Sequence, residues 1–390
     1  MKRLALLLLI LSFCLTACEK DEAPILATAD QTLLMYLPWA TDLLPNFQTN
    51  ISDMESAIAK GILKRERVVV FLSTSPTQAE LFELKYQKGT CIRIPLKDYT
   101  SLAFTTAAGI TSILEDVKGF APAHRYAMTI GCHGMGWVPV SKIGKARSIG
   151  QKYHWEYEGV PMTRFFGGLS SNYQTDITTL AKGITDAGIK MEYILFDDCY
   201  MSSIEVAYDL KEVADYLIAS PCEIMAYGMP YAEIGPHLLG KVNYEGICDA
   251  FLLFYQNYTA MPCGTIGVTV CSEVDRLAAV MKEINAQCTF DTSLRSSIQR
   301  LDGYFPALFF DYGDYVAKLC STAPDLLAKF EAQLERTVPS QYRKHTDYFY
   351  TMSSGKIKIK TYSGITASDP SINSDAATLP QTAWYRATHE

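Results

Sequence analysis

The sequence has few basic residues, no nucleotide-binding loop and no metal-binding pattern. Its 390 residues include 35 Lys and Arg against 42 Asp and Glu, which gives a net charge of −7. An acidic chain of this kind argues against a nucleic-acid-binding surface. Neither GxGxxG nor GxxxxGK[ST] occurs, so a doubly wound nucleotide- or flavin-binding domain is not favoured. The scattered histidines lack metal spacing and no loop follows an EF-hand pattern, so no metal site is expected.

The one long apolar run of the chain lies near its N-terminus. Basic Lys2 and Arg3 precede an apolar run over 4–15, and small residues precede Cys18. This pattern predicts a secretory signal peptide over 1–17, because the run is too short to span a bilayer comfortably and lacks the caps of a buried helix. Leu-Thr-Ala-Cys resembles a bacterial lipobox. We therefore expect an exported protein anchored through lipid on Cys18 in the outer membrane, and the sequence leaves open whether it faces the cell surface.

Residues 18–30 form a polar tether between the anchor and the folded part. Within it, Lys20-Asp21-Glu22 resembles the surface-export signal of Bacteroidetes lipoproteins, and the alternative is a solvated linker. Two of the 11 cysteines fall in the signal or the anchor. The other nine, an odd number without CxxC spacing, are compatible with one or two disulfides or with buried free thiols, and the spacing favours no pairing.

Strand-like and helix-like blocks alternate from Thr32 onward, which predicts an α/β fold with a mainly parallel sheet covered by helices on both faces. A catalytic domain is expected over 31–240 and a C-terminal α/β subdomain over 241–390. Strands are expected at 32–37, 67–73, 80–87, 90–95, 126–130, 193–196, 215–220, 264–271, 356–360 and 362–366. Helices are expected at 50–60 with Ser52 or Asp53 as cap, 105–118, 176–187, 203–213, 244–258, 273–286, 312–320 and 325–336.

Two of the predicted strands end in residues that carry chemistry. One is followed by His133, Gly134 and Gly136, and the other by Asp197, Asp198 and Cys199. A helix pattern capped by Ser202 or Ser203 begins directly after the cysteine. Helix N-termini favour the thiolate form of cysteine, and a nearby histidine is a general base, so the two strands together suggest a Cys-His dyad.

The same residues resemble the clostripain-like cysteine peptidases, which are relatives of caspases, legumains and gingipains. The resemblance is carried by His-Gly-Met-Gly-Trp at 133–137 and Phe-Asp-Asp-Cys-Tyr-Met-Ser-Ser-Ile-Glu-Val-Ala-Tyr at 196–208. It implies a caspase-like fold in which Cys199 is the nucleophile and His133 the acid and base. It also implies that the amides of Gly134 and Cys199 hold the oxyanion.

The resemblance further implies a preference for Arg or Lys before the cleaved bond. Asp197 lies where the family has the acid at the floor of the S1 pocket, and a strand-end carboxylate that caps a loop is the competing interpretation. Glu223 is a second acidic candidate, with helix capping as its alternative. Asp198 departs from the family pattern, and we expect its side chain to face away from the thiol.

The interval between the two motifs contains a basic, poorly patterned segment over 138–159. It is either an exposed loop or the activation segment that the family cleaves in its own chain. The candidate scissile positions are Lys142, Lys145, Arg147 and Lys152.

These observations predict a monomeric, lipid-anchored cysteine endopeptidase that acts on peptides or proteins. No cofactor is expected to be required, although the resemblance leaves calcium assistance open. The alternative is a non-catalytic surface lipoprotein that binds a peptide or host protein. The presence of both His133 and Cys199 argues against that alternative.

Overall fold

The computed structural model describes residues 27–40, 42–140, 167–168 and 170–390. The predicted signal peptide, Cys18 and most of the tether lie outside these residues, as do the four candidate self-cleavage positions.

Nine strands of the described chain form one twisted sheet in the order β10-β8-β7-β6-β5-β1-β2-β3-β4. The five central strands, from β7 to β2, run parallel, whereas the outer strands on both sides pair antiparallel. This is the mostly parallel sheet that the alternating pattern predicted, in the caspase-like form that the family resemblance implied. The strands are β1 (Ala29–Leu37), β2 (Glu66–Ser75), β3 (Gln78–Gln87), β4 (Thr90–Thr100), β5 (Ala123–Gly131), β6 (Met191–Asp197), β7 (Ala214–Ala219), β8 (Thr265–Val270) and β10 (Lys344–His345).

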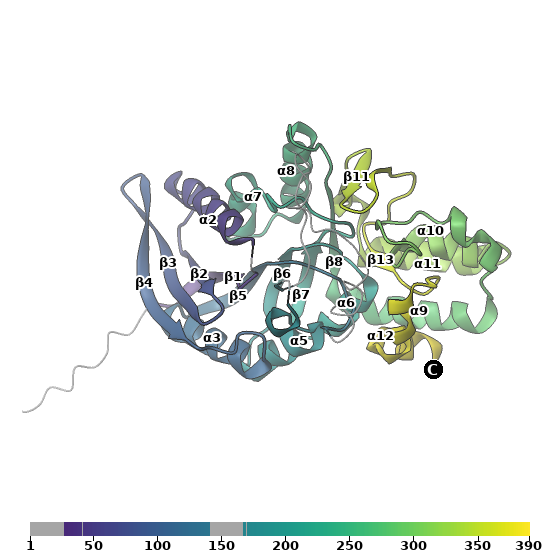
Figure 1. Ribbon diagram of the computed structural model, residues 1–390, viewed down its shortest axis with the longest axis horizontal. Coiled ribbons are helices and arrows are strands. Elements are labelled where there is room, and N and C mark those ends of the chain that lie inside the picture. The colour runs from purple at the N-terminus through teal and green to yellow at the C-terminus, as the bar shows by residue number, and fades with distance from the viewer. Residues whose placement is uncertain (1–26, 41, 141–166, 169) are drawn as a thin grey trace, which may run out of the picture.

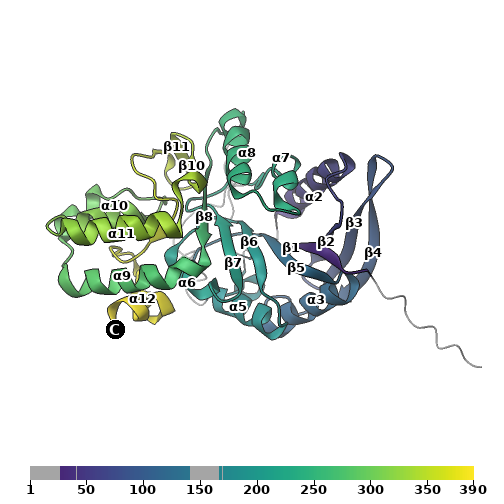
Figure 2. The ribbon, with the colours of Figure 1, turned by 180° about the vertical axis from the view of Figure 1, so that it is seen from behind.

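Helices cover both faces of this sheet (Figures 1 and 2). On one face lie α2 (Leu44–Ala59), α7 (Tyr231–Leu238) and α8 (Tyr244–Asn257), which pack in a row. On the other face lie α3 (Ala107–Phe120), α5 (Ile177–Asp186) and α6 (Ile204–Leu210). The central strands are therefore buried on both sides, which explains why their sequences are nearly continuous apolar runs.

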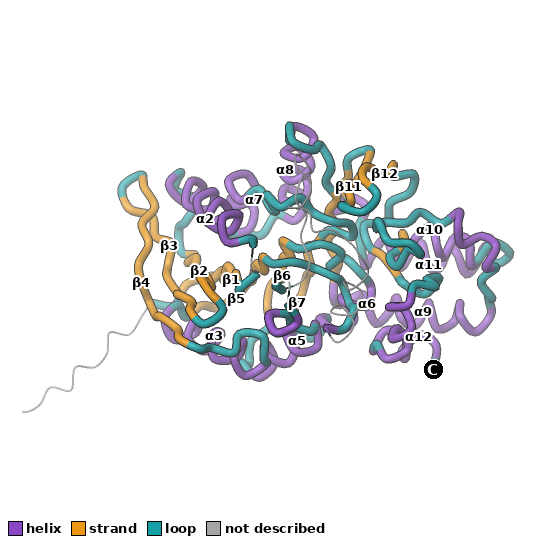
Figure 3. The backbone as a smooth tube through the Cα atoms, viewed as in Figure 1, coloured by secondary structure: helices purple, strands orange, loops and turns teal. Residues whose placement is uncertain are grey.

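The remaining elements form a C-terminal lobe beside the β8 end of the sheet (Figure 3). Its helices are α9 (Val274–Gln287), α10 (Tyr312–Leu319), α11 (Pro324–Thr337) and α12 (Ala383–His389). Its short strands are β9 (Phe310–Asp311), β11 (Tyr348–Thr351), β12 (Gly355–Lys358) and β13 (Thr366–Ala367). Short 3-10 helices occur at Ser171–Tyr173, Cys271–Glu273, Thr292–Ser297, Ser340–Tyr342 and Ser374–Gln381.

Three expectations about elements are corrected. The domain boundary expected after residue 240 cuts across the sheet, because β8 and β10 are strands of it. Helix α2 begins at Leu44 rather than at residue 50, with a proline in its first turn instead of a Ser52 or Asp53 cap. The strand expected at 362–366 is reduced to the two residues of β13, which pair with β9.

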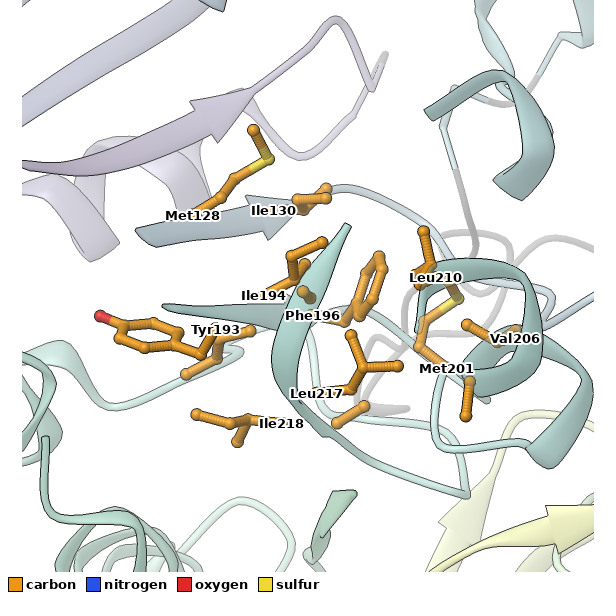
Figure 4. Packing of buried hydrophobic residues seen from close by; sticks show 14 of the residues in the cluster. Met128, Ile130, Tyr193, Ile194, Phe196, Met201, Val206, Leu210, Leu217 and Ile218 are labelled. Carbon is orange, nitrogen blue, oxygen red and sulfur yellow. The ribbon is translucent and has the colours of Figure 1, made fainter. Parts of the chain in front are cut away.

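The core of the sheet fixes the positions of the two strand ends that carry the candidate site. Apolar side chains of β5, β6 and β7 pack against Met201 and α6, as Figure 4 shows for Ile130, Phe196, Val206 and Leu210. The helix begins where predicted, since the Ser203 hydroxyl accepts the Val206 N–H at 3.3 Å. The carboxyl ends of β5 and β6 are thereby fixed side by side, at the edge where open α/β sheets carry their sites.

Candidate active site

The two sequence motifs meet at the carboxyl ends of β5 and β6. The parallel register of these strands pairs Gly131 with Asp197, the last residue of each strand. His133 and Cys199 each follow two residues later, so the chain carries both side chains to the same edge of the sheet. Both residues are completely buried.

Gly134 lies directly against the backbone of Cys199. A Cβ atom on Gly134 would come within 2.1 Å of the Cys199 carbonyl oxygen and 2.7 Å of its amide nitrogen. A side chain is therefore excluded at this position, and only glycine allows the two backbones to approach so closely. The sequence paired these two residues through family resemblance alone.

His133 is held by contacts on two sides. Its Nε2 lies 2.8 Å from Oδ1 of Asp42, and its backbone N–H donates to the Gly167 carbonyl at 3.2 Å. Asp42 follows β1, the strand next to β5 in the sheet. Sequence reasoning missed Asp42, because no motif connects it to His133. The available signal was the position of Asp42, an acidic residue soon after the strand predicted at 32–37, which ends at the same edge of the sheet as the strand before His133.

Cys199 lies in a tight turn that its neighbours brace. The Ile224 N–H donates to the Cys199 sulfur at 3.3 Å, and donors of this kind favour the thiolate. Tyr200 has a φ of +62°, a left-handed conformation that is uncommon for a residue with a side chain. Its ring stacks on Phe309 with centroids 4.9 Å apart, so a buried aromatic contact stabilises the strained turn.

The two carboxylates before Cys199 both bind backbone amides. Asp198 is buried, and its Oδ1 accepts the Cys132 N–H at 2.5 Å, which connects the cysteine turn to the histidine strand. Asp197 is also buried, and its Oδ1 accepts the Met229 N–H at 2.7 Å. This bond is the loop-capping contact that the competing interpretation of Asp197 predicted. Met229 lies in the loop just before α7.

Glu223 lies in the loop after β7 and not at a helix end. One of its carboxylate oxygens accepts from the Tyr200 hydroxyl at 2.7 Å and the other from the Met352 N–H at 3.1 Å. It therefore connects the cysteine turn to the turn between β11 and β12. Tyr304, which contacts both Tyr200 and Met135, completes this support.

The C-terminal lobe is bound directly to the residues that follow Cys199. The Thr366 N–H donates to the Ser202 carbonyl at 3.0 Å, and the Ser368 N–H donates to Glu205 at 2.8 Å. Trp137 donates its indole N–H to the Ser368 hydroxyl at 2.9 Å, so the histidine loop rests on the same segment. Burial and the nearby Asp369 raise the pKa of Glu205 to about 8.

Both ends of the interval between the motifs are anchored near this site. Gly167, just after the interval, pairs with His133 in an isolated β-bridge. Val140, just before the interval, donates its N–H to Asp176 at 2.8 Å. The candidate scissile residues between these ends lie outside the described residues.

Neither a metal cluster nor a membrane span is found among the described residues. No group of three or more His, Cys, Asp and Glu side chains there is arranged to hold a metal ion. Within the same part of the chain, every helix is too short or too polar to cross a bilayer.

The sheet, its helices and the paired His and Cys strand ends define a caspase-like peptidase architecture. Residues 47–299 match the model of the clostripain family, peptidase C11. The chain belongs to the clostripain family and is a cysteine peptidase. No curated protein matches the chain.

Solved structures agree with this assignment. The chain is 61% identical to a secreted C11 cysteine protease from Bacteroides thetaiotaomicron, "iotapain", with a TM-score of 0.86 over 93% of this chain and 100% of that one. It is 66% identical to a clostripain from the same species in complex with the peptide inhibitor BTN-VLTK-AOMK, with a TM-score of 0.56 over 58% of this chain and 99% of that one. An inactive zymogen C11 protease from Parabacteroides distasonis is 25% identical, with a TM-score of 0.76 over 94% and 100%.

Proposed function

We propose that this peptidase is an exported, lipid-anchored monomer that cleaves proteins after Arg or Lys through Cys199 and His133. The observation that carries the proposal is the close approach of Gly134 to the Cys199 backbone at the ends of two paired strands. This arrangement brings a nucleophile, a base and two backbone amides to one edge of the sheet. Those are the parts that acyl transfer needs.

Asp42 sets the roles of the two His133 nitrogens. With Nε2 donating to Asp42, Nδ1 is the nitrogen that exchanges a proton with the thiol of Cys199. The histidine takes the thiol proton as Cys199 attacks the carbonyl carbon, and then gives it to the leaving amine. Asp42 orients the ring and stabilises its protonated form, so it acts as a positioning residue.

The oxyanion of the tetrahedral intermediate is held by the amides of Gly134 and Cys199. Their backbones pack against each other, which brings the two amides to one place. The bond from the Ile224 N–H supports the thiolate before attack. Asp198 fixes the spacing of the two motifs through its bond to Cys132.

A basic side chain before the cleaved bond is recognised by Asp197, with Glu223 as a second acidic group. Support comes from a relative that is 66% identical and binds an inhibitor whose peptide part, VLTK, ends in lysine. Asp197 is buried and Glu223 half-buried, and a buried carboxylate gains most from a charged partner. In this proposal Asp197 keeps its bond to Met229 while it receives the substrate cation.

Export and anchoring through Cys18 complete the proposal. A relative that is 61% identical is described as secreted, and the lipobox-like sequence ends at Cys18. A diacylated cysteine holds a protein on a membrane more firmly than a single acyl chain does. The catalytic domain then works beside the outer membrane, on substrates that reach the surface.

The test is a cleavage assay on the chain from Glu19 onward. Peptides that differ only in Arg, Lys, Asn, Asp or Ala before the scissile bond are compared for wild type, Cys199→Ala and His133→Ala. We expect turnover after Arg and Lys, and a loss of at least about a thousandfold in both variants. Cys263→Ala, which removes a buried thiol in the loop before β8, is the matched control and should keep its activity.

Asp197→Asn separates specificity from catalysis. If Asp197 binds the substrate cation, kcat/KM for Arg and Lys peptides falls by about a hundredfold while an Ala peptide is little affected. An equal loss on every peptide would assign Asp197 to the support of the loop at Met229 alone. Turnover by Cys199→Ala at the wild-type rate would overturn the dyad itself.

A further inference from the structure

Two cysteines outside the active site meet where two helices of the C-terminal lobe end. Cys288 directly follows α9, and Cys320 directly follows α10. Cys288 lies close enough to the Cys320 thiol to raise its pKa, and both cysteines are free thiols in the structure. The rings of Phe290, just after α9, and Tyr315, within α10, meet edge to face with centroids 5.5 Å apart, so the chain that follows α9 packs on α10 independently of the thiols.

The surroundings of the two thiols differ in a way that matters for their chemistry. Cys320 is buried, with 1% of its surface exposed, whereas Cys288 is only half-buried and accessible from solvent. Cys248, another buried cysteine of this half of the chain, instead donates to the Tyr342 carbonyl at 3.4 Å. The pair at 288 and 320 therefore combines contact with access.

We propose that Cys288 and Cys320 are oxidised to a disulfide in the exported protein by thiol-disulfide exchange with a disulfide oxidant of the cell envelope. The inference rests on the export included in the proposed function, because disulfides persist in oxidising compartments. Two neighbouring cysteine side chains at the ends of packed elements need only a small approach to bring their sulfurs to the bonded distance of about 2.05 Å.

The half-buried thiol of Cys288, which solvent can reach, reacts first. The thiolate of Cys288 attacks one sulfur of the oxidant and releases the other as a thiolate, which leaves a mixed disulfide on Cys288. Burial and the adjacent Cys288 raise the pKa of Cys320 to about 12, so Cys320 stays protonated until it meets this mixed disulfide. Cys320 then loses its proton to water and attacks the Cys288 sulfur. The second half of the oxidant leaves as a thiolate, so two protein thiols are oxidised and one disulfide is reduced.

The disulfide would close a loop of the chain, residues 288–320, that contains the side chains packed against the turn at Cys199. Between the two cysteines, the Asp302 carboxylate accepts the N–H groups of Tyr304, Leu308 and Phe309. Tyr304 and Phe309 are the rings that pack on Tyr200, the residue after Cys199. Cross-linking the ends of this segment restricts the unfolded chain and stabilises the folded lobe.

The experiment oxidises the folded Cys199→Ala protein, in which the nucleophile cannot react, with glutathione disulfide in a glutathione buffer. Free thiols are then alkylated, and the unreduced peptides are mapped by mass spectrometry. We expect a Cys288–Cys320 linked peptide and a rise in Tm of roughly 5 °C, both reversed by dithiothreitol. The matched control Cys91→Ser, which removes a half-buried thiol at the far edge of the sheet, should behave the same way.

Cys288→Ser and Cys320→Ala, each in the same background, should lose both the linked peptide and the rise in Tm. The mapping on the parent protein decides the matter even if a variant folds poorly. Alkylation of both cysteines after oxidation would overturn the proposal. So would a stable glutathione adduct on Cys288 beside a reduced Cys320, or a disulfide that joins either cysteine to a different partner.

Discussion

At the scale of single residues, the candidate site depends on contacts that sequence motifs do not contain. The motifs name His133 and Cys199, but the partner of the histidine, Asp42, comes from another strand end. The donor to the thiol, Ile224, lies in the loop after β7. Both contacts are made across the sheet, between residues far apart in the chain. A linear pattern identifies reactive groups more readily than it identifies the groups that orient them.

Replacing Asp42 tests its role beside His133. Asp42→Ala removes the acceptor at Nε2, so the ring loses its fixed orientation and kcat should fall by about a hundredfold or more while KM changes little. Asp42→Asn keeps an acceptor oxygen and should recover part of the rate. Steady-state kinetics on one Arg peptide measure both effects.

The matched control is Asp30→Asn, at the other end of the same strand region, whose carboxylate pairs with Arg65 at the surface. It should leave kcat unchanged. Wild-type kcat in Asp42→Ala would show that His133 needs no carboxylate.

Gly134 gives a second prediction at this scale. In Gly134→Ala the new methyl group overlaps the Cys199 backbone, so the two amides must separate and kcat/KM should fall by at least about a hundredfold. Gly119→Ala is the control, since a Cβ there meets nothing within 4 Å. Circular dichroism checks that both variants fold. Near-normal activity of Gly134→Ala would refute an oxyanion site at these amides.

At the scale of elements, the buried Glu205 makes the junction between α6 and the C-terminal lobe dependent on pH. Its pKa is raised to about 8 from an ordinary value of 4.5 by burial and by Asp369, which itself interacts with His389. Such a group stabilises the fold fully below the unfolded pKa. That contribution is lost as pH rises from about 4.5 through about 8, because only the unfolded chain ionises freely over that range.

Glu205→Gln should remove this dependence while it keeps an acceptor for the Ser368 N–H. Between pH 6 and pH 9, the free energy of unfolding of the wild type should fall by on the order of a few kcal/mol more than that of the variant. Urea unfolding at several pH values measures the difference. Glu331→Gln, on an exposed part of α11, is the control, and equal slopes for wild type and Glu205→Gln would contradict the assignment.

The order of elements was largely predictable, whereas the ends and partners of elements were not. Buried strands such as β1 and β2 carry long apolar runs, and the edge hairpin of β3 and β4 has a Lys-Gly turn, so local patterns indicate them. The start of α2 was missed, because its first turn contains Pro45 and has no polar side-chain cap. The domain boundary expected after residue 240 was misplaced, because β8 joins the sheet only through pairing with β7, a strand far from it in the sequence.

At the scale of the whole molecule, the sheet explains how a chain cut between the motifs can stay assembled. The strands from β1 to β5 precede the interval 141–166 and those from β6 onward follow it, yet β5 and β6 pair along their length. Both ends of the interval are also anchored, at Asp176 and at His133. After a cut at a basic residue in the interval, the two fragments would therefore stay together as a noncovalent complex.

Self-cleavage is the prediction that follows at this scale. In the uncut chain His133 and Cys199 are fully buried, so substrate access requires a change near them. Replacing Lys142, Lys145, Arg147 and Lys152 together by Ala should leave the chain whole on denaturing gels and lower kcat/KM by at least about tenfold. Wild type should give two fragments that co-elute on size exclusion, with or without EDTA, because calcium is not expected to be required. Full activity of the uncut quadruple variant would mean that the buried pair opens without cleavage, and restoring the four residues singly identifies the scissile bond.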